Sequence, residues 1–196
     1  MKCIFFIILG GFLYSTAQTT PCKVQFSGEM KNVMWKGQLS GTIQPDTIAP
    51  KAGTYGVGPL EGLRGELLLI DGDLWQSTVT GPETMKVGKA PGAKAPFFVY
   101  SKCTDWKAMK LPDDARDLPE LEHFLDSLAK NIDVPFVFRI KGTVNIATIH
   151  VVNLAPGSKV SSPEDAHKGQ ESYRIFNEPS EIVGFFSRHN QSVFTH

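Results

Sequence analysis

The chain has 196 residues, with 20 basic and 20 acidic side chains and a formal charge of zero at pH 7. This length allows one large domain or two small ones with a buried core, which excludes a peptide hormone and a small scaffold held by disulfides alone. The balanced charge gives no indication of a nucleic-acid partner or of binding to an anionic membrane surface.

The first 17 residues have the composition of a secretory signal peptide. A short basic start is followed by an apolar core from Ile4 to Leu13 and by small residues that end at Ala17. An uncleaved membrane anchor is the alternative, but the apolar run is too short to span a bilayer comfortably. We therefore expect residues 1–17 to be removed and the mature protein to be secreted or periplasmic, with no membrane partner.

Two cysteines remain after the expected cleavage, Cys22 and Cys103. In an oxidising compartment they could form a disulfide bond that ties the N-terminal segment to the strand near Phe97. Two free thiols are the alternative, and the sequence does not decide between them.

The N-terminal part is expected to begin with short elements. Val24 to Phe26 alternates like a strand, and the apolar spacing from Met30 to Leu39 predicts a short helix. Thr54 to Gly65 is rich in glycine, which permits unusual backbone torsions and close approaches. We interpret it as an ordered, tightly folded loop.

A β-hairpin follows this glycine-rich segment. Glu66 to Ile70 is an apolar run, Asp71-Gly72 is typical of a primed two-residue turn, and Leu74 to Gln76 starts the second strand. Glu66 therefore opens a rigid strand. A solvated glutamate on an edge strand is the alternative, because most glutamates are exposed.

The next segments predict a loop, a strand and a helix. Gly81 to Lys94 is rich in glycine, proline and lysine and is expected to be a mobile surface loop. Phe97 to Tyr100 is a short apolar strand. Leucine and phenylalanine residues from Leu118 to Leu128 fall on one helical face, with Asp117 as a candidate N-cap and Asn131 as a stop. We expect this helix to pack its apolar face on a sheet.

The rest of the chain is predicted almost entirely as β-structure. Phe136 to Ile140 is one strand, Lys141-Gly142 a turn, and Val144 to Val152 a second strand with alternating apolar residues. Two further strands are expected near Ser172 to Phe176 and Glu181 to Ser187.

These elements predict an α+β protein in two parts. Residues 18–133 are expected to form an N-terminal part with a mixed sheet and a few helices. Residues 134–196 are expected to form the start of an antiparallel, barrel-like β part that is incomplete at its C-terminus.

Three segments carry a recognisable motif. The first has the order G-x-G-x-x-x-x-L-x-G-E-L-x-x-x-D-G-x-x-x-Q, written here as Gly56, Gly58, Leu63, Gly65, Glu66, Leu67, Asp71, Gly72 and Gln76. The second is Phe138 to Gly142, and the third is Ile182 to Phe185. Their order and spacing resemble the α-acetolactate decarboxylases, whose second segment contains R-I-D-G and whose third is an L-V-G-F strand.

The resemblance implies conversion of 2-acetolactate, a small-molecule substrate, to acetoin and carbon dioxide. When the carboxylate leaves, its electrons flow into the neighbouring ketone and give an enediolate that must be stabilised and protonated. The family binds zinc through three histidines, two of them in an H-x-H pair after the L-V-G-F strand, and the metal acts as a Lewis acid. The resemblance also suggests a homodimer.

Two residues match the site of the family by motif. Glu66 matches the glutamate of its L-D-G-E segment, a carboxylate that can give or accept a proton at the enediolate. Arg139 matches the arginine of R-I-D-G, whose guanidinium suits the substrate carboxylate or the enediolate oxygens. The segments also differ, because Pro59 replaces a threonine and Arg64 replaces the aspartate of L-D-G-E.

The zinc ligands that the resemblance implies are missing. His189 and His196 follow the third segment, but neither belongs to an H-x-H pair. We therefore expect a form truncated before that pair, with a divergent member that lost the site as the alternative. The 196-residue chain is expected to bind no stoichiometric zinc and to form no acetoin. A non-catalytic, secreted, β-rich protein that binds a small molecule is the competing function.

Overall fold

The computed structural model describes residues 22–48, 52–113, 115–130, 132, 134–189 and 193, so the expected signal peptide lies outside the described residues. One sheet has six strands in the order β1-β6-β2-β3-β4-β5, and every neighbouring pair is antiparallel. Its strands are β1 (Val24–Ser27), β2 (Thr54–Pro59), β3 (Glu66–Ile70), β4 (Asp73–Gly81), β5 (Thr84–Lys89) and β6 (Phe98–Lys102).

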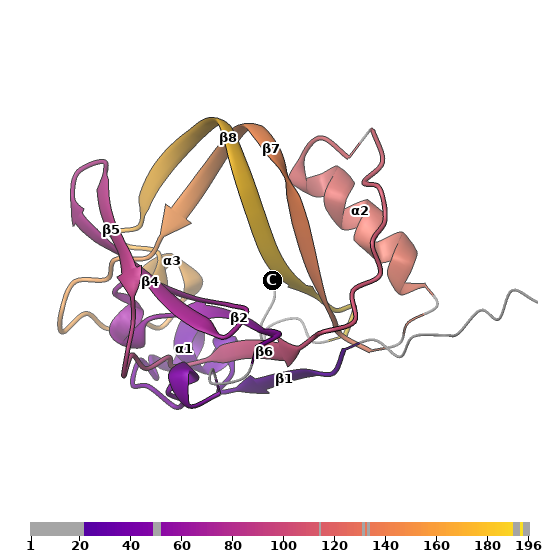
Figure 1. The fold of residues 1–196 in the computed structure, drawn as a ribbon. Coiled ribbons are helices and arrows are strands. Elements are labelled where there is room, and N and C mark those ends of the chain that lie inside the picture. Colours follow the sequence, from indigo (N-terminus) through magenta and orange to yellow (C-terminus); the bar gives the residue numbers. More distant parts are fainter. Residues whose placement is uncertain are drawn as a thin grey trace, which may run out of the picture.

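The second sheet is a long hairpin of two antiparallel strands, β7 (Phe136–Val151) and β8 (Glu171–Phe186). Figure 1 shows this hairpin as an arch above the six-stranded sheet. The helices are α1 (Met30–Lys36), α2 (Leu118–Ala129) and α3 (Pro163–Ala166), with short 3-10 turns at Pro45–Thr47 and Glu61–Leu63. Helix α2 lies beside the arch, and α1 and α3 lie at the opposite end of the molecule (Figure 1).

The α+β class is confirmed, and the strand pairs refine it. The first sheet is antiparallel throughout, and the second is not closed into a barrel among the described residues. The boundary near residue 134 stays a prediction. One buried cluster nevertheless spans both sides of it, because Tyr55 and Val99 pack with Val137 and Phe185.

The predicted β3–β4 hairpin is confirmed. Asp71 and Gly72 both have positive φ, 51° and 86°, as a primed turn requires. Strand β3 lies between β2 and β4, so the alternative of an edge-strand position for Glu66 is wrong.

The expected loop from Thr54 to Gly65 is wrong over its first half, because Thr54–Pro59 is strand β2 at the centre of the sheet. The glycines there allow close packing and do not make turns. A Cβ added to Gly56 would lie 2.4 Å from the ring of Phe98, and one on Gly58 would lie 2.4 Å from the Phe97 carbonyl oxygen. Glycine is required here because a neighbouring strand leaves no space for a side chain.

The expected mobile loop from Gly81 to Lys94 is also wrong. Strand β4 continues to Gly81, and Thr84–Lys89 returns as β5. The side chains of β5 are mostly exposed, which explains the polar composition that suggested a loop.

The predicted turn at Lys141-Gly142 is wrong, and so is the division of the last β segment into two strands. Lys141 pairs with Glu181 and Gly142 with Ser180 in a ladder that continues on both sides of them. Pro179 can occur in this ladder because both strands of a two-stranded sheet are edge strands.

The helix predictions are confirmed. Met30–Lys36 is α1, and Asp117 caps α2 by accepting a hydrogen bond from the Glu120 N–H at 3.0 Å. The predicted stop at Asn131 lies outside the described residues. Within the described part of the chain, no helix has the length and apolar character needed to cross a bilayer.

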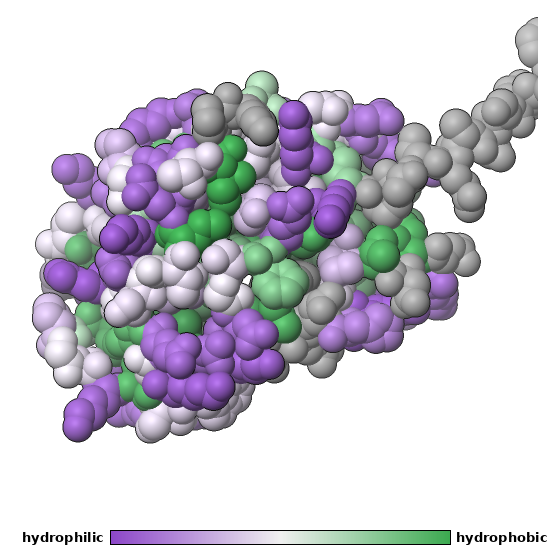
Figure 2. Space-filling model, turned by 90° about the horizontal axis from the view of Figure 1, so that it is seen from below, coloured by the Kyte–Doolittle hydropathy of each residue, from purple (hydrophilic) through white to green (hydrophobic). Residues whose placement is uncertain are grey.

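Cys22 and Cys103 form a disulfide bond, so the alternative of two free thiols is wrong. The bond joins the segment before β1 to the end of β6. On the lower face of the molecule, small groups of hydrophobic side chains alternate with polar ones (Figure 2). Scattered apolar exposure of this kind is normal and does not indicate a partner.

Candidate active site

One face of the six-stranded sheet carries Glu66, whereas the other predicted site residue, Arg139, lies on β7 of the second sheet. Side chains alternate between the two faces of a strand, and residues paired across two strands point to the same face. Val57 pairs with Leu68, and Pro59 pairs with Glu66, so these four side chains share one face of the sheet. Tyr55, Val57 and Ile70 pack in the cluster that includes residues of β7 and β8. Glu66 is in phase with these residues and therefore faces the β7–β8 hairpin.

The carboxyl group of Glu66 lies in a protein environment that favours its neutral form. Its Oε1 accepts a hydrogen bond from the Val152 N–H at 3.1 Å, just beyond the end of β7. Burial raises the pKa of Glu66 to about 7, and the Val152 hydrogen bond opposes that rise. Near neutral pH, the group therefore exists in both protonation states.

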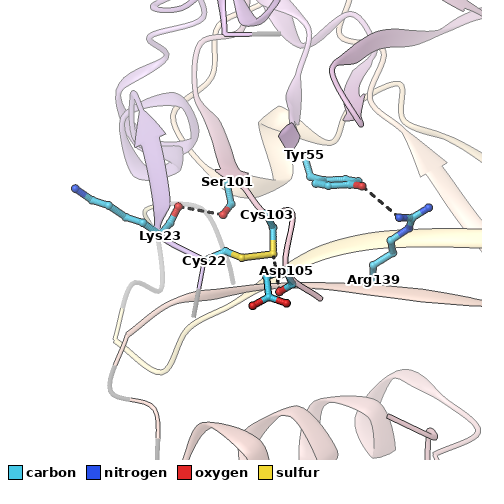
Figure 3. Close-up of a disulfide and its surroundings, with 7 residues drawn as sticks. All are labelled: Cys22, Lys23, Tyr55, Ser101, Cys103, Asp105 and Arg139. Carbon is cyan, nitrogen blue, oxygen red and sulfur yellow. Dashed lines mark hydrogen bonds between the residues drawn. A yellow bond between two sulfur atoms is a disulfide. The ribbon is translucent and has the colours of Figure 1, made fainter. Parts of the chain in front are cut away.

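Arg139 is held from two sides near the other end of β7. Its Nε forms an ion pair with Oε1 of Glu181 on β8, and its Nη1 donates a hydrogen bond to the Tyr55 hydroxyl at 3.2 Å. Figure 3 shows the Tyr55 and Arg139 side chains pointing toward one another. The Glu181 carboxylate raises the pKa of Arg139, and Arg139 in turn lowers the pKa of Glu181.

Lys141 adds a second positive charge to this group. Its Nζ lies 3.4 Å from Oε2 of Glu181, and the two residues face each other across the β7–β8 ladder. Arg139, Lys141 and Glu181 together carry a net charge of +1, from two cations and one anion. The Asp71 carboxylate also acts on Arg139, so the four groups together have no net charge.

Arg139 and Lys141 line a cavity of about 440 Å³ between α2 and β7. Apolar side chains form most of its walls, including Leu121 and Phe124 from α2 and Phe136 from β7. A cavity of this size with few polar groups is typical of small-molecule sites. The apolar face of α2 thus faces β7 across this cavity, whereas the prediction was that it packs directly on a sheet.

The structure places Glu66 and Arg139 on the same side of the sheet but does not bring them together. Tyr55 is the partner of Arg139. Gly56 pairs with Leu69, so Tyr55, one residue before Gly56, lies beside Ile70, one residue after Leu69. Ile70 is four residues from Glu66 along β3, or roughly 14 Å at the usual rise of a strand. Glu66 is also absent from the lining of the cavity.

The described residues do not fit a zinc site of the three-histidine type. No group of three histidine, cysteine, aspartate or glutamate side chains gathers anywhere in the described part of the chain. His189 is exposed, and His196 lies outside the described residues.

Three residues of the Arg139 cluster, Tyr55, Lys141 and Glu181, were not predicted as site residues, and Lys141 was expected only in a turn. Tyr55 comes directly before the matched G-x-G motif, and Glu181 comes directly before the third matched segment. The only signal for Glu181 is its charge, which becomes informative once its pairing with Lys141 is known. Tyr55 has no such signal, because an aromatic residue in a strand is ordinary.

Comparisons with known proteins agree with this fold. The model of the family "Alpha-acetolactate decarboxylase" matches residues 26–194. An alpha-acetolactate decarboxylase from Bacillus subtilis strain 168 has 19% identity and a TM-score of 0.65, covering 87% of this chain and 70% of that chain. An acetolactate decarboxylase from Bacillus subtilis subspecies spizizenii has 20% identity and a TM-score of 0.70, covering 87% and 71%.

A third solved structure comes from Staphylococcus aureus and is described as a protein of unknown function similar to alpha-acetolactate decarboxylase. It has 19% identity and a TM-score of 0.64, covering 84% of this chain and 67% of that chain. At these identities the structural likeness supports the fold alone. A comparison with curated protein sequences found no match.

Proposed function

This chain belongs to the alpha-acetolactate decarboxylase family, and we propose that it serves the conversion of 2-acetolactate to acetoin and carbon dioxide. The observation that carries the proposal is the carboxyl group of Glu66, whose pKa of about 7 suits proton transfer near neutral pH. It lies on a strand with partners on both sides, which gives a rigid support for catalysis.

Glu66 is proposed to donate the proton that converts the enediolate to acetoin. As carbon dioxide leaves, the electron pair of the broken C–C bond moves into the adjacent ketone and gives an enediolate. The neutral carboxyl group of Glu66 then donates its proton to carbon and is left as a carboxylate, which recovers a proton from solvent. No step is assigned to a metal, because the described residues do not form a group of three ligands.

Arg139 is proposed to bind the substrate carboxylate. A guanidinium group binds a carboxylate through two parallel N–H donors, and the cavity beside Arg139 has room for a small molecule. Its pKa is raised, so the group remains a cation under all physiological conditions.

Glu66 and Arg139 are therefore assigned separate tasks. Arg139 lines the cavity beside α2, whereas Glu66 is not among the residues that line it.

A second function is favoured by the absence of Glu66 from the lining of the cavity and by the lack of a three-ligand group among the described residues. In this alternative, the protein is a non-catalytic relative that binds a small hydroxy acid through Arg139 and leaves the acid unchanged.

The test is acetoin formation from 2-acetolactate, together with zinc content, for the 196-residue chain and for the product of the complete reading frame. In the complete product we expect Glu66→Gln and Arg139→Ala to lower turnover at least about a hundredfold without unfolding. Glu122→Gln, an exposed carboxylate on α2, is the control.

For the 196-residue chain on its own we expect neither a zinc equivalent nor acetoin, because its described residues supply a proton donor and a carboxylate-binding group but no three-ligand metal group. A zinc equivalent with turnover would contradict this expectation. Binding of 2-acetolactate without turnover in both forms would support the non-catalytic function.

We also propose that the protein is exported and acts as a homodimer. The composition of residues 1–17 and the Cys22–Cys103 disulfide support export, because such bonds persist in oxidising compartments. The N-terminal sequence of the mature protein and its mass in solution test the two statements.

A further inference from the structure

We propose that Tyr55 is a positioning residue, which together with Glu181 aims the guanidinium of Arg139 so that its terminal edge is presented to the carboxylate of a small 2-hydroxy acid. The inference rests on the proposed function, in which Arg139 binds the substrate carboxylate. It adds two residues that the sequence motifs do not contain.

The hydrogen-bond donors of Arg139 divide between orientation and binding. A guanidinium has five N–H groups in one plane. Nε forms an ion pair with Oε1 of Glu181, and one N–H of Nη1 donates a hydrogen bond to the Tyr55 hydroxyl. The second N–H of Nη1 and both of Nη2 have no recorded acceptor among the described residues. These donors form the terminal edge of the group, which is the edge that can bind a carboxylate through two parallel bonds.

The exposure of Arg139 and the charges around it bear on this division of its donors. The Arg139 side chain is 23% exposed, and Arg139 is among the residues that line the cavity, while its guanidinium points toward Tyr55 on the six-stranded sheet (Figure 3). Glu181 alone would cancel the charge of Arg139. Lys141, which is 63% exposed, lies against the other oxygen of Glu181 and shares its charge, so Glu181 does not act on Arg139 alone.

Tyr55 is suited to positioning because it cannot easily move. It is only 3% exposed, and its ring meets Trp106 edge to face with centroids 5.1 Å apart. The Arg139 Cζ lies 5.6 Å from the centre of the same ring. The Cys22–Cys103 disulfide packs in the same buried cluster and fixes the chain three residues before Trp106 (Figure 3).

The test uses the purified 196-residue chain and 2-hydroxyisobutyrate. This probe has the carboxylate and the tertiary hydroxyl of 2-acetolactate but no ketone, so it cannot decarboxylate. Calorimetric titration of Tyr55→Phe should show a Kd about tenfold higher than that of the unchanged chain, because one hydrogen bond to a charged group is lost. Tyr100→Phe is the matched control, because Tyr100 packs against the cluster on the opposite face of the sheet.

A second measurement reports the orientation of the Arg139 guanidinium directly. The ¹⁵N signals of the Arg139 Nη groups, assigned by their loss in Arg139→Lys, should be separate in the unchanged chain and averaged by rotation in Tyr55→Phe. The thermal midpoints of Tyr55→Phe and Tyr100→Phe should stay close to that of the unchanged chain, because both keep their packed rings.

The inference is overturned if Tyr55→Phe binds the probe within twofold of the unchanged chain and keeps separate Nη signals. If the unchanged chain does not bind the probe, while the complete product forms acetoin at the same rate with and without Tyr55→Phe, this inference fails and the proposed function stands. If neither binding nor acetoin formation occurs, the proposed function fails as well.

Discussion

Replacing Glu66 by glutamine should remove a specific pH dependence of stability. The folded protein raises the pKa of Glu66 from 4.5 to about 7, mainly by burial. Between these values the folded protein holds a proton that the unfolded chain has lost, so the free energy of unfolding falls as pH rises. The full difference corresponds to about 3 kcal/mol, and we expect about 1–3 kcal/mol because the side chain is only partly buried.

The assay is urea unfolding of the unchanged chain and of Glu66→Gln at steps from pH 4.5 to pH 8. The variant should gain stability relative to the unchanged chain across this window, with most of the gain between pH 5 and pH 7. Glu122→Gln controls for the loss of an exposed carboxylate. Parallel curves for Glu66→Gln and the unchanged chain would refute the assignment of a raised pKa to Glu66.

Two further predictions concern stability. Cys22 and Cys103 are 81 residues apart, so reduction of their bond should lower the free energy of unfolding by about 4.5 kcal/mol, measured by urea unfolding with and without reductant; equal midpoints would contradict this. Gly56→Ala should cost about 1–3 kcal/mol because its Cβ would collide with the Phe98 ring. Gly142→Ala, whose Cβ would have open space, should differ little from the unchanged chain, and thermal melts that rank the two variants in the opposite order would refute the packing argument.

Features with strong local signals could be predicted from the sequence. The turn at Asp71-Gly72 has residues that tolerate positive φ, and α2 has both an N-cap and a continuous apolar face. Strand β2 was not predictable in this way. Glycine there accommodates the ring of Phe98, and only the pairing of distant strands reveals that contact.

Contacts between distant strands also determine the candidate site, and the local sequence does not predict them. The motifs identify Glu66 and Arg139, but they do not show that Arg139 lines the cavity beside α2 and Glu66 does not, which depends on the path of the arch. Glu181 becomes a partner of Arg139 only because β7 and β8 continue through Lys141-Gly142 without a turn. Long-range pairing, which local patterns do not contain, therefore decides the arrangement of the site.

The central claim is that Glu66 supplies a proton during decarboxylation. The most direct test is the rate of acetoin formation from 2-acetolactate by the product of the complete reading frame, measured from pH 5 to pH 9. The account predicts that kcat/KM falls as pH rises above about 7, where Glu66 loses its proton, and that Glu66→Gln is at least about a hundredfold slower with no such step. An unchanged rate and the same pH profile in Glu66→Gln would contradict it.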